Sequence, residues 1–235
     1  LNAVLKLRDQ AAWCPRRDEA YLGVLVDDLI SKGTQEPYRM FTSRAEFRLL
    51  LREDNADLRL TEQGRRLGLV ADERWQRFER KREAIEREQQ RLRDIWVQPN
   101  SPLAEQVTAL FDSPISKETR ALDLLARPDV DYAQLCSLPS LGPALGDGEA
   151  AEQLEIQARY AGYIKRQQVE IDRLQANDAL KLPDSFDYAA VRGLSAEVRE
   201  KLIRRRPATI GQASRIPGLT PAAISLLLIH LKRKS

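Results

Sequence analysis

Apolar residues recur at steps of three and four along most of the chain, which is the spacing of amphipathic helices. The pattern predicts a helix over residues 18–32, with Gly33 as its C-cap, and two long charged helices over residues 71–96 and 149–176. Aromatic residues are few at 6% and charged residues many at 31%, a composition typical of long helices rather than strands. We therefore expect an all-α fold.

Each of the two long helices carries an apolar seam. The seam residues are Trp75, Phe78, Ile85, Leu92 and Trp96 in the first helix and Leu154, Ala161, Ile164, Ile171 and Leu174 in the second. Two such helices predict an antiparallel, coiled-coil-like pair with a structural role. Between them, prolines break the chain repeatedly, and we expect short helices over residues 103–111, 117–126 and 132–138.

Residues 36–59 carry five arginines around an apolar Leu49-Leu50-Leu51 run: Arg39, Arg44, Arg48, Arg52 and Arg59. Arg44, Arg48 and Arg52 are four residues apart, so a helix would align them on one face. Thr42 or Ser43 could cap that helix, with Glu46 completing a capping box, and residues 54–57 would begin the next helix. Guanidinium groups suit phosphate or carboxylate binding. The alternative is an ordinary solvated face that Glu46 and Glu53 partly neutralise.

The last segment, residues 183–235, contains the same short motif at residues 192–195 and 217–220: a glycine, an apolar residue and a Ser or Thr that caps a helix. Such pairs are similar to helix-hairpin-helix elements, which bind nucleic-acid backbones through amides at a helix N-terminus. The same turns also simply join helices, so both interpretations stay open.

The closing helix, residues 220–234, is apolar almost all round, which predicts contact with a partner as well as with its own core. The candidate partner-binding residues are Ile224, Leu227, Leu228 and Leu231. His230 lies among them and is expected to be a core or interface residue rather than a ligand. The chain from residue 192 onward holds ten lysines and arginines against two glutamates, although the net charge of the whole is only +3. This excess suggests an anionic partner for the last segment.

Several kinds of chemistry lack support in the sequence. Cys14 and Cys136 are far apart and His230 is the single histidine, so no zinc spacing exists and a reducing compartment is the simplest reading. No Gly-rich nucleotide fingerprint and no Ser-His-acid or Cys-His pairing occurs. The longest apolar run, residues 222–229, is shorter than the ~20 residues that a bilayer requires. We expect no metal, no membrane span and no catalysis by this chain alone. Because it begins at Leu1 inside an amphipathic segment, we also expect a piece of a larger protein.

Three stretches resemble the C-terminal part of the MnmG (GidA) family. They are PYRMFTSRAEFRLLLREDNADLRL with the following TEQGRRLGL, YAGYIKRQQ at residues 160–168, and IGQASRIPGLTPAAISLLL at residues 210–228. Members of this family are FAD-dependent enzymes of the bacterial cytoplasm that add a carboxymethylaminomethyl or aminomethyl group to the wobble uridine of tRNA. They use NADH as reductant and methylenetetrahydrofolate as one-carbon donor, and are typically homodimers.

The resemblance implies a division of labour within a longer protein. A flavin-binding domain before Leu1 would hold the FAD and the catalytic groups, and no cofactor is expected in this chain by itself. Residues 37–59 would contribute to tRNA contact, and the C-terminal helices would dock an MnmE-type GTPase. We expect three segments: residues 1–70 beside the flavin domain, 71–182 as the long-helix pair, and 183–235 as the partner-binding module. The alternatives are a purely structural helical scaffold, with the arginines paired to carboxylates, and a helix-hairpin-helix-like nucleic-acid-binding module.

Overall fold

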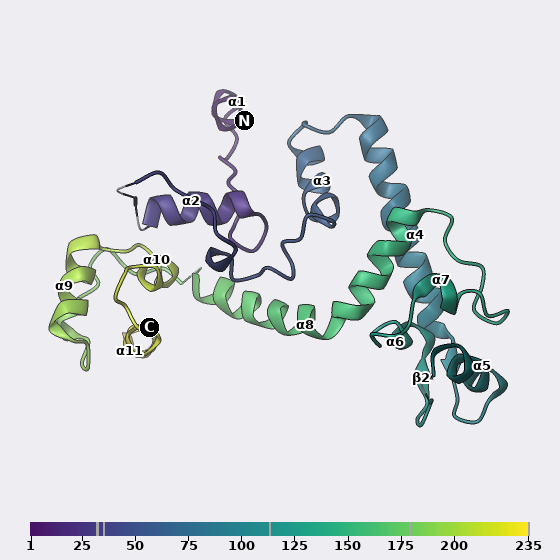
Figure 1. The fold of residues 1–235 in the computed structure, drawn as a ribbon. Helices are drawn as coiled ribbons and strands as arrows, with labels where there is room; N and C mark the ends of the chain where they lie inside the picture. Colours follow the sequence, from purple (N-terminus) through teal and green to yellow (C-terminus); the bar gives the residue numbers. More distant parts are fainter. Residues whose placement is uncertain (32, 35, 113, 179, 235) are drawn as a thin grey trace. The chain divides into compact units, whose positions relative to one another are not determined.

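The structure is a computed structural model that describes residues 1–31, 33–34, 36–112, 114–178 and 180–234 (Figure 1). It is built almost wholly from helices, which confirms the predicted class. The elements in chain order are α1 (Asn2–Leu7), α2 (Tyr21–Ser31), η1 (Thr42–Arg44), α3 (Ala56–Arg66), α4 (Asp72–Asp94), β1 (Trp96–Val97), α5 (Pro102–Phe111), β2 (Thr119–Arg120), α6 (Ala121–Leu124), α7 (Tyr132–Leu135), α8 (Gly148–Asp178), η2 (Tyr188–Ala190), α9 (Ala196–Arg205), α10 (Ile210–Ser214) and α11 (Pro221–Lys234).

The chain folds into two compact units. One unit combines Leu1–Arg48 with Arg166–Ser235, and the other is Leu49–Lys165. The long helix α8 is continuous across the boundary, so it contributes residues to both units. The division into three segments that the sequence suggested stays a prediction.

In the unit Leu49–Lys165, helix α4 packs against α3 and α6. The two-residue strands β1 and β2 pair antiparallel, with Trp96 opposite Arg120. The core of this unit collects fully buried side chains from α4, α6, α7, α8 and the loops between them; the largest are Leu92, Leu124, Leu125, Leu135, Leu141 and Leu154. Helix α5 begins where expected, because Ser101 caps it by accepting a hydrogen bond from the Ala104 amide at 3.1 Å.

A buried polar network ties α7 to α4 inside the same unit. The Arg91 guanidinium donates to both oxygens of Glu88 at 2.7 and 2.6 Å and to the Leu141 carbonyl at 2.8 Å, while the Tyr132 hydroxyl donates to Glu88 at 2.9 Å. Its hydrogen bonds to Glu88 raise the pKa of Arg91, and burial raises the pKa of Tyr132. The network is fully charge-paired and has a structural role.

The predicted antiparallel coiled coil between the two long helices is not confirmed. Arg77 of α4 pairs with Glu149 of α8 at 2.7 Å, and Gln89 of α4 donates to Gln157 of α8 at 2.8 Å. The residue numbers of the contacting residues therefore increase in the same direction along both helices, as in a parallel pair. The segment from β1 to α7 carries the chain back toward the beginning of α4 before α8 starts, so the two helices meet in the same direction. Ala161, one of the predicted seam residues, is exposed.

In the other unit, residues 180–234 form a small helical module around their own core. Leu202 of α9, Ile210 and Ala213 of α10, and Leu227 of α11 are completely buried in it. Both predicted caps are present: Ser195 accepts from the Val198 amide at 3.2 Å, and Thr220 accepts from the Ala223 amide at 3.3 Å. In the same unit α2 ends as predicted, because the amide of Gly33, with φ +70°, donates to the Leu29 carbonyl.

Candidate anion-binding site

The segment 37–48, which we name the arginine loop, is not the helix that the sequence predicted. Only η1 is helical in it, and turns follow through residue 50. Arg17 explains the difference, because its guanidinium donates to the Arg44 carbonyl at 3.1 Å and to Glu46 at 2.7 Å. In an α-helix that carbonyl would accept from the amide four residues later, and Glu46 would reach the cap. The predicted stripe of three arginines and the capping box are therefore both wrong.

The arginine loop is held by a network around Asp28 of α2, whose side chain is only 1% exposed. Asp28 accepts from Arg17 at 2.8 Å and from the Tyr38 hydroxyl at 2.9 Å, and Arg44 approaches it to 3.5 Å. Burial raises the pKa of Tyr38, reinforced by its hydrogen bond to Asp28, so the phenol stays a donor at neutral pH. The network fixes both ends of residues 38–44.

Arg17 is the second centre of this network and bridges three carboxylates. It lies 3.0 Å from Asp27, 2.8 Å from Asp28 and 2.7 Å from Glu46. Burial alone would lower the pKa of Arg17, but the hydrogen bonds to Glu46 and Asp28 outweigh it and raise the pKa. Arg17 and Asp28 were not predicted from the sequence as functional residues. The sequence signal for this network was a pair of arginines, Arg16-Arg17, shortly before α2 and a pair of aspartates, Asp27-Asp28, within it.

The predicted anion-binding arginines divide into two groups. Arg39 and Arg48 are exposed and make no hydrogen bond or ion pair within the part of the chain that the structure describes. Arg44 is half-exposed and lies over the Tyr38 ring, 4.6 Å from its centroid, with the Phe41 ring at 5.8 Å. These three residues belong to the arginine loop and remain candidates for binding an external anion.

Arg52 and Arg59 have internal partners instead. Arg52 forms a two-pronged ion pair with Asp54 at 3.0 and 3.1 Å, and Arg59 donates to the Asn55 side chain at 2.8 Å and to the Arg52 carbonyl at 3.0 Å. Asp54 is partly buried, which would raise its pKa, but the hydrogen bonds from Arg52 and Gln153 outweigh burial and lower it. Contrary to the sequence expectation, these two arginines brace the turn that leads into α3.

The predicted partner-binding residues of α11 differ in burial. Leu227 is completely buried in the core of its own module, so it cannot contact a partner, and its assignment was wrong. Ile224 and Leu228 are half-buried against that core, and Leu231 is half-buried. Ile229 of the helix is a large apolar residue that is 54% exposed. His230 lies edge-on to Phe186 with ring centroids 5.5 Å apart, in agreement with the core or interface role expected for it.

The two glycine turns of the module are used for packing. A Cβ atom on Gly193 would lie 3.1 Å from Leu226, and one on Gly218 would lie 2.5 Å from Lys201. Both glycines also have φ near +90°. The repeated motif therefore brings helix ends close together. Its backbone geometry alone does not assign it a ligand.

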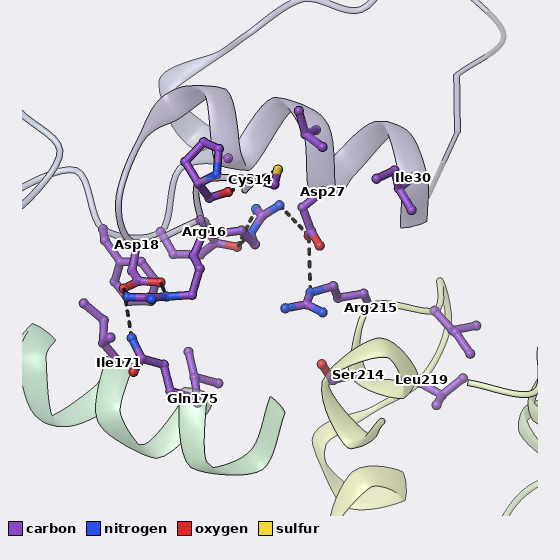
Figure 2. Close-up of a pocket in the computed structure, with 18 of the residues that line it drawn as sticks. Cys14, Arg16, Asp18, Asp27, Ile30, Ile171, Gln175, Ser214, Arg215 and Leu219 are labelled. Atoms are coloured by element: carbon purple, nitrogen blue, oxygen red, sulfur yellow. Dashed lines mark hydrogen bonds and ion pairs between the residues drawn. The ribbon is translucent and has the colours of Figure 1, made fainter. Parts of the chain in front are cut away.

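A cavity of about 880 Å³ lies between α2, the last turns of α8 and residues 214–219 (Figure 2). Figure 2 shows Arg215 paired with Asp27, at 3.2 Å, and Gln175 donating to Asp18, at 2.9 Å. Every charged side chain in its wall has an ion-pair partner within the wall or beside it. The cavity therefore offers a ligand no uncompensated charge.

The described residues do not contain the nucleotide-binding unit typical of flavin and nicotinamide cofactors. Such cofactors take a parallel strand–turn–helix unit with a Gly-rich turn, whereas the sheet in the described residues is one antiparallel pair of two-residue strands. In the same residues, no three His, Cys, Asp or Glu side chains gather as metal ligands. None of the described helices is long and apolar enough to span a bilayer.

Comparison with known proteins gives a consistent result. The family model described as the tRNA modifying enzyme MnmG/GidA C-terminal helical domain matches residues 72–168, and the one described as its C-terminal helical bundle matches residues 170–235. The chain is 35% identical to Aquifex aeolicus GidA, with a TM-score of 0.75 for the form II crystal and 0.73 for form I. These matches cover 98% of this chain but only 36% and 35% of the solved chains.

Proposed function

The chain belongs to the MnmG/GidA family of tRNA-modifying enzymes, and we propose that it is the helical part through which such an enzyme binds its tRNA and a partner protein. The reaction would be the addition of a carboxymethylaminomethyl or aminomethyl group to a wobble uridine, in the cytoplasm. FAD, with NADH as its reductant, would be held by a part of the enzyme outside this chain. Homodimer formation belongs to the same proposal.

The exposed arginines of the arginine loop are the observation that carries the tRNA-binding role. Arg39 and Arg48 reach solvent without a carboxylate partner in the described residues, and Glu46, the acid nearest to Arg48 in the sequence, is paired with Arg17. Arg44 of the same loop contacts Asp28 and the Tyr38 ring and is half-exposed. Guanidinium groups placed in this way bind phosphates of an RNA backbone, which position the substrate without reading its sequence.

A salt series on the intact protein tests this role. Replacing an arginine that contacts phosphate weakens tRNA binding and flattens the plot of log K against log[salt] by about one unit. We expect that result for Arg48→Ala and an unchanged slope for the matched control Arg52→Ala, because Arg52 is occupied by Asp54. An unchanged affinity and slope for Arg48→Ala would contradict the proposal and leave a structural role for the arginine loop.

The C-terminal module is the proposed docking surface for an MnmE-type GTPase. The chain from residue 192 onward has an excess of eight positive charges, from ten basic and two acidic residues. Helix α11 adds exposed Ile229 and half-buried Leu231. An apolar centre with a charged surround is typical of a protein–protein contact.

The docking role has its own test, with a matched control in the same module. We expect Ile229→Asp to weaken binding of the purified GTPase roughly tenfold. The control Ile203→Asp changes an equally apolar, exposed residue of α9 and should bind normally. Equal binding by both variants and the wild type would contradict docking through α11.

A further inference from the structure

Phe41 is an exposed aromatic residue in the centre of the arginine loop. Its side chain is 53% exposed, whereas Phe47, six residues later, is 5% exposed and belongs to the interior. Arg39 precedes it by two residues and Arg44 follows it by three. Burying this ring against a ligand would be favourable in water, because it removes apolar surface from solvent.

The backbone at Phe41 is held by the turn that follows it, and a guanidinium lies near its ring. Residues 42–44 form η1 directly after Phe41, and the Arg44 amide donates to the Phe41 carbonyl at 2.9 Å. The Arg44 guanidinium is 4.6 Å from the centroid of the Tyr38 ring, 5.8 Å from that of the Phe41 ring and 3.5 Å from buried Asp28. The loop thus combines one exposed aromatic face, one fixed guanidinium and two exposed arginines.

We propose that Phe41 is the stacking platform for an unpaired base of the RNA that the arginine loop binds; this rests on the tRNA-binding role proposed above. Proteins recognise single-stranded loops by stacking splayed bases on aromatic side chains, while arginines bind the neighbouring phosphates. A paired stem hides its base faces, so this arrangement selects loop nucleotides over duplex. The substrate class of the site is therefore an RNA loop with a base turned out of its stack.

Charge favours RNA over a protein surface as the occupant of this ring. Between residues 37 and 48 there are three arginines and one acidic residue, Glu46. Glu46 is 2.7 Å from Arg17, which leaves the loop with uncompensated positive charge. Contact with a protein surface is the competing outcome that the experiment must distinguish.

The experiment measures binding of the intact protein to an RNA hairpin that carries 2-aminopurine in its loop, against the same label in a fully paired duplex. Stacking on an aromatic ring quenches this fluorophore. For Phe41→Leu we expect roughly tenfold weaker hairpin binding and loss of the quench. The salt slope should not change, because phenylalanine releases no counterion. Phe41→Trp should keep both the affinity and the quench, and duplex binding should be the same in all three proteins.

The other outcomes show whether the stacking role alone fails or the tRNA-binding role fails with it. If Phe41→Leu binds the hairpin with wild-type affinity and quench while Arg48→Ala flattens the salt slope, the stacking role fails and tRNA contact stands. If Phe41→Leu instead lowers the unfolding midpoint of the intact protein without changing RNA binding, a protein surface covers the ring and stacking is refuted. If neither variant changes RNA binding, the proposed function of the arginine loop fails as well.

Discussion

Two neighbouring segments of this chain both carry arginines and use them in opposite ways. In the arginine loop, Arg39 and Arg48 are exposed and have no partner among the described residues. Around the start of α3, Arg52 and Arg59 are held by Asp54, Asn55 and backbone carbonyls. Spacing along the sequence does not distinguish the two groups, since Arg48 and Arg52 are four residues apart.

The difference lies in which acceptors each arginine can reach. Arg52 has a carboxylate two residues later and Arg59 an amide oxygen four residues earlier. Arg48 has Glu46 two residues earlier, but Arg17 already binds that carboxylate at 2.7 Å. A residue distant in sequence thus removes the local partner and leaves a guanidinium group for an external anion. Charge patterns become informative about binding only after the acceptors have been assigned.

The largest expected effect comes from removing the support of the arginine loop. Asp28→Ala leaves Arg17, Tyr38 and Arg44 without a buried acceptor, and breaking a buried ion pair in this way costs roughly 3 kcal/mol. We expect the urea-unfolding midpoint to drop accordingly. The neighbouring control Asp27→Ala removes a more exposed carboxylate and should cost about 1 kcal/mol. Equal losses would show that Asp28 has no special supporting role.

A smaller effect is expected in the free energy of unfolding, which should differ between a variant of Arg52 and a variant of Arg48. Arg52→Ala removes a two-pronged ion pair from a partly buried site, and we expect a loss of about 1 to 2 kcal/mol in the free energy of unfolding. Arg48→Ala changes an exposed side chain and should stay within about 0.5 kcal/mol of the wild type. Chemical denaturation of both variants measures the difference, and a larger loss for Arg48→Ala would reverse the assignment.

The smallest expected effect is on the pH dependence of the free energy of unfolding. Because the pKa of Asp54 is lowered in the folded protein, its carboxylate contributes stability above the unfolded pKa of about 4, and this contribution is lost as the pH falls through the folded value. Arg52→Ala removes a cause of the lowered pKa, so stability should fall less steeply with acid in that variant. Unfolding curves measured between neutral pH and about pH 3 test this. An identical acid dependence would exclude the Arg52–Asp54 pair as its source.

Much of the fold could be predicted because the signals were local. The helices α2, α4, α8 and α11 lie within a few residues of their expected bounds, and α9 begins after its expected cap, Ser195. Their apolar periodicity, glycine C-cap or Ser and Thr N-caps act within one or two turns of the chain. The direction of α8 relative to α4 could not be predicted, because an apolar seam is the same for parallel and antiparallel pairing. The return path through the short helices decides it.

The candidate site was predicted in composition but not in conformation. The five arginines were identified, yet the helix that would align them depends on the Arg44 carbonyl, which Arg17 occupies from 27 residues away. The prediction for Leu227 was wrong for a similar reason. Its apolar neighbours suggested an external partner, but the core of residues 180–234 buries it. Both failures arise where a contact distant in sequence overrides a local pattern.

The central claim is that the exposed arginines of the arginine loop bind RNA phosphate, and the salt dependence of tRNA binding tests it most directly. The double variant Arg39→Ala/Arg48→Ala is compared with Arg204→Ala/Arg206→Ala, which removes the same charge from exposed positions of α9 and its C-cap. We predict that the slope of log K against log[salt] falls by about two units for the first variant only. Equal slopes for the two variants, or a loss confined to the second, would contradict the account.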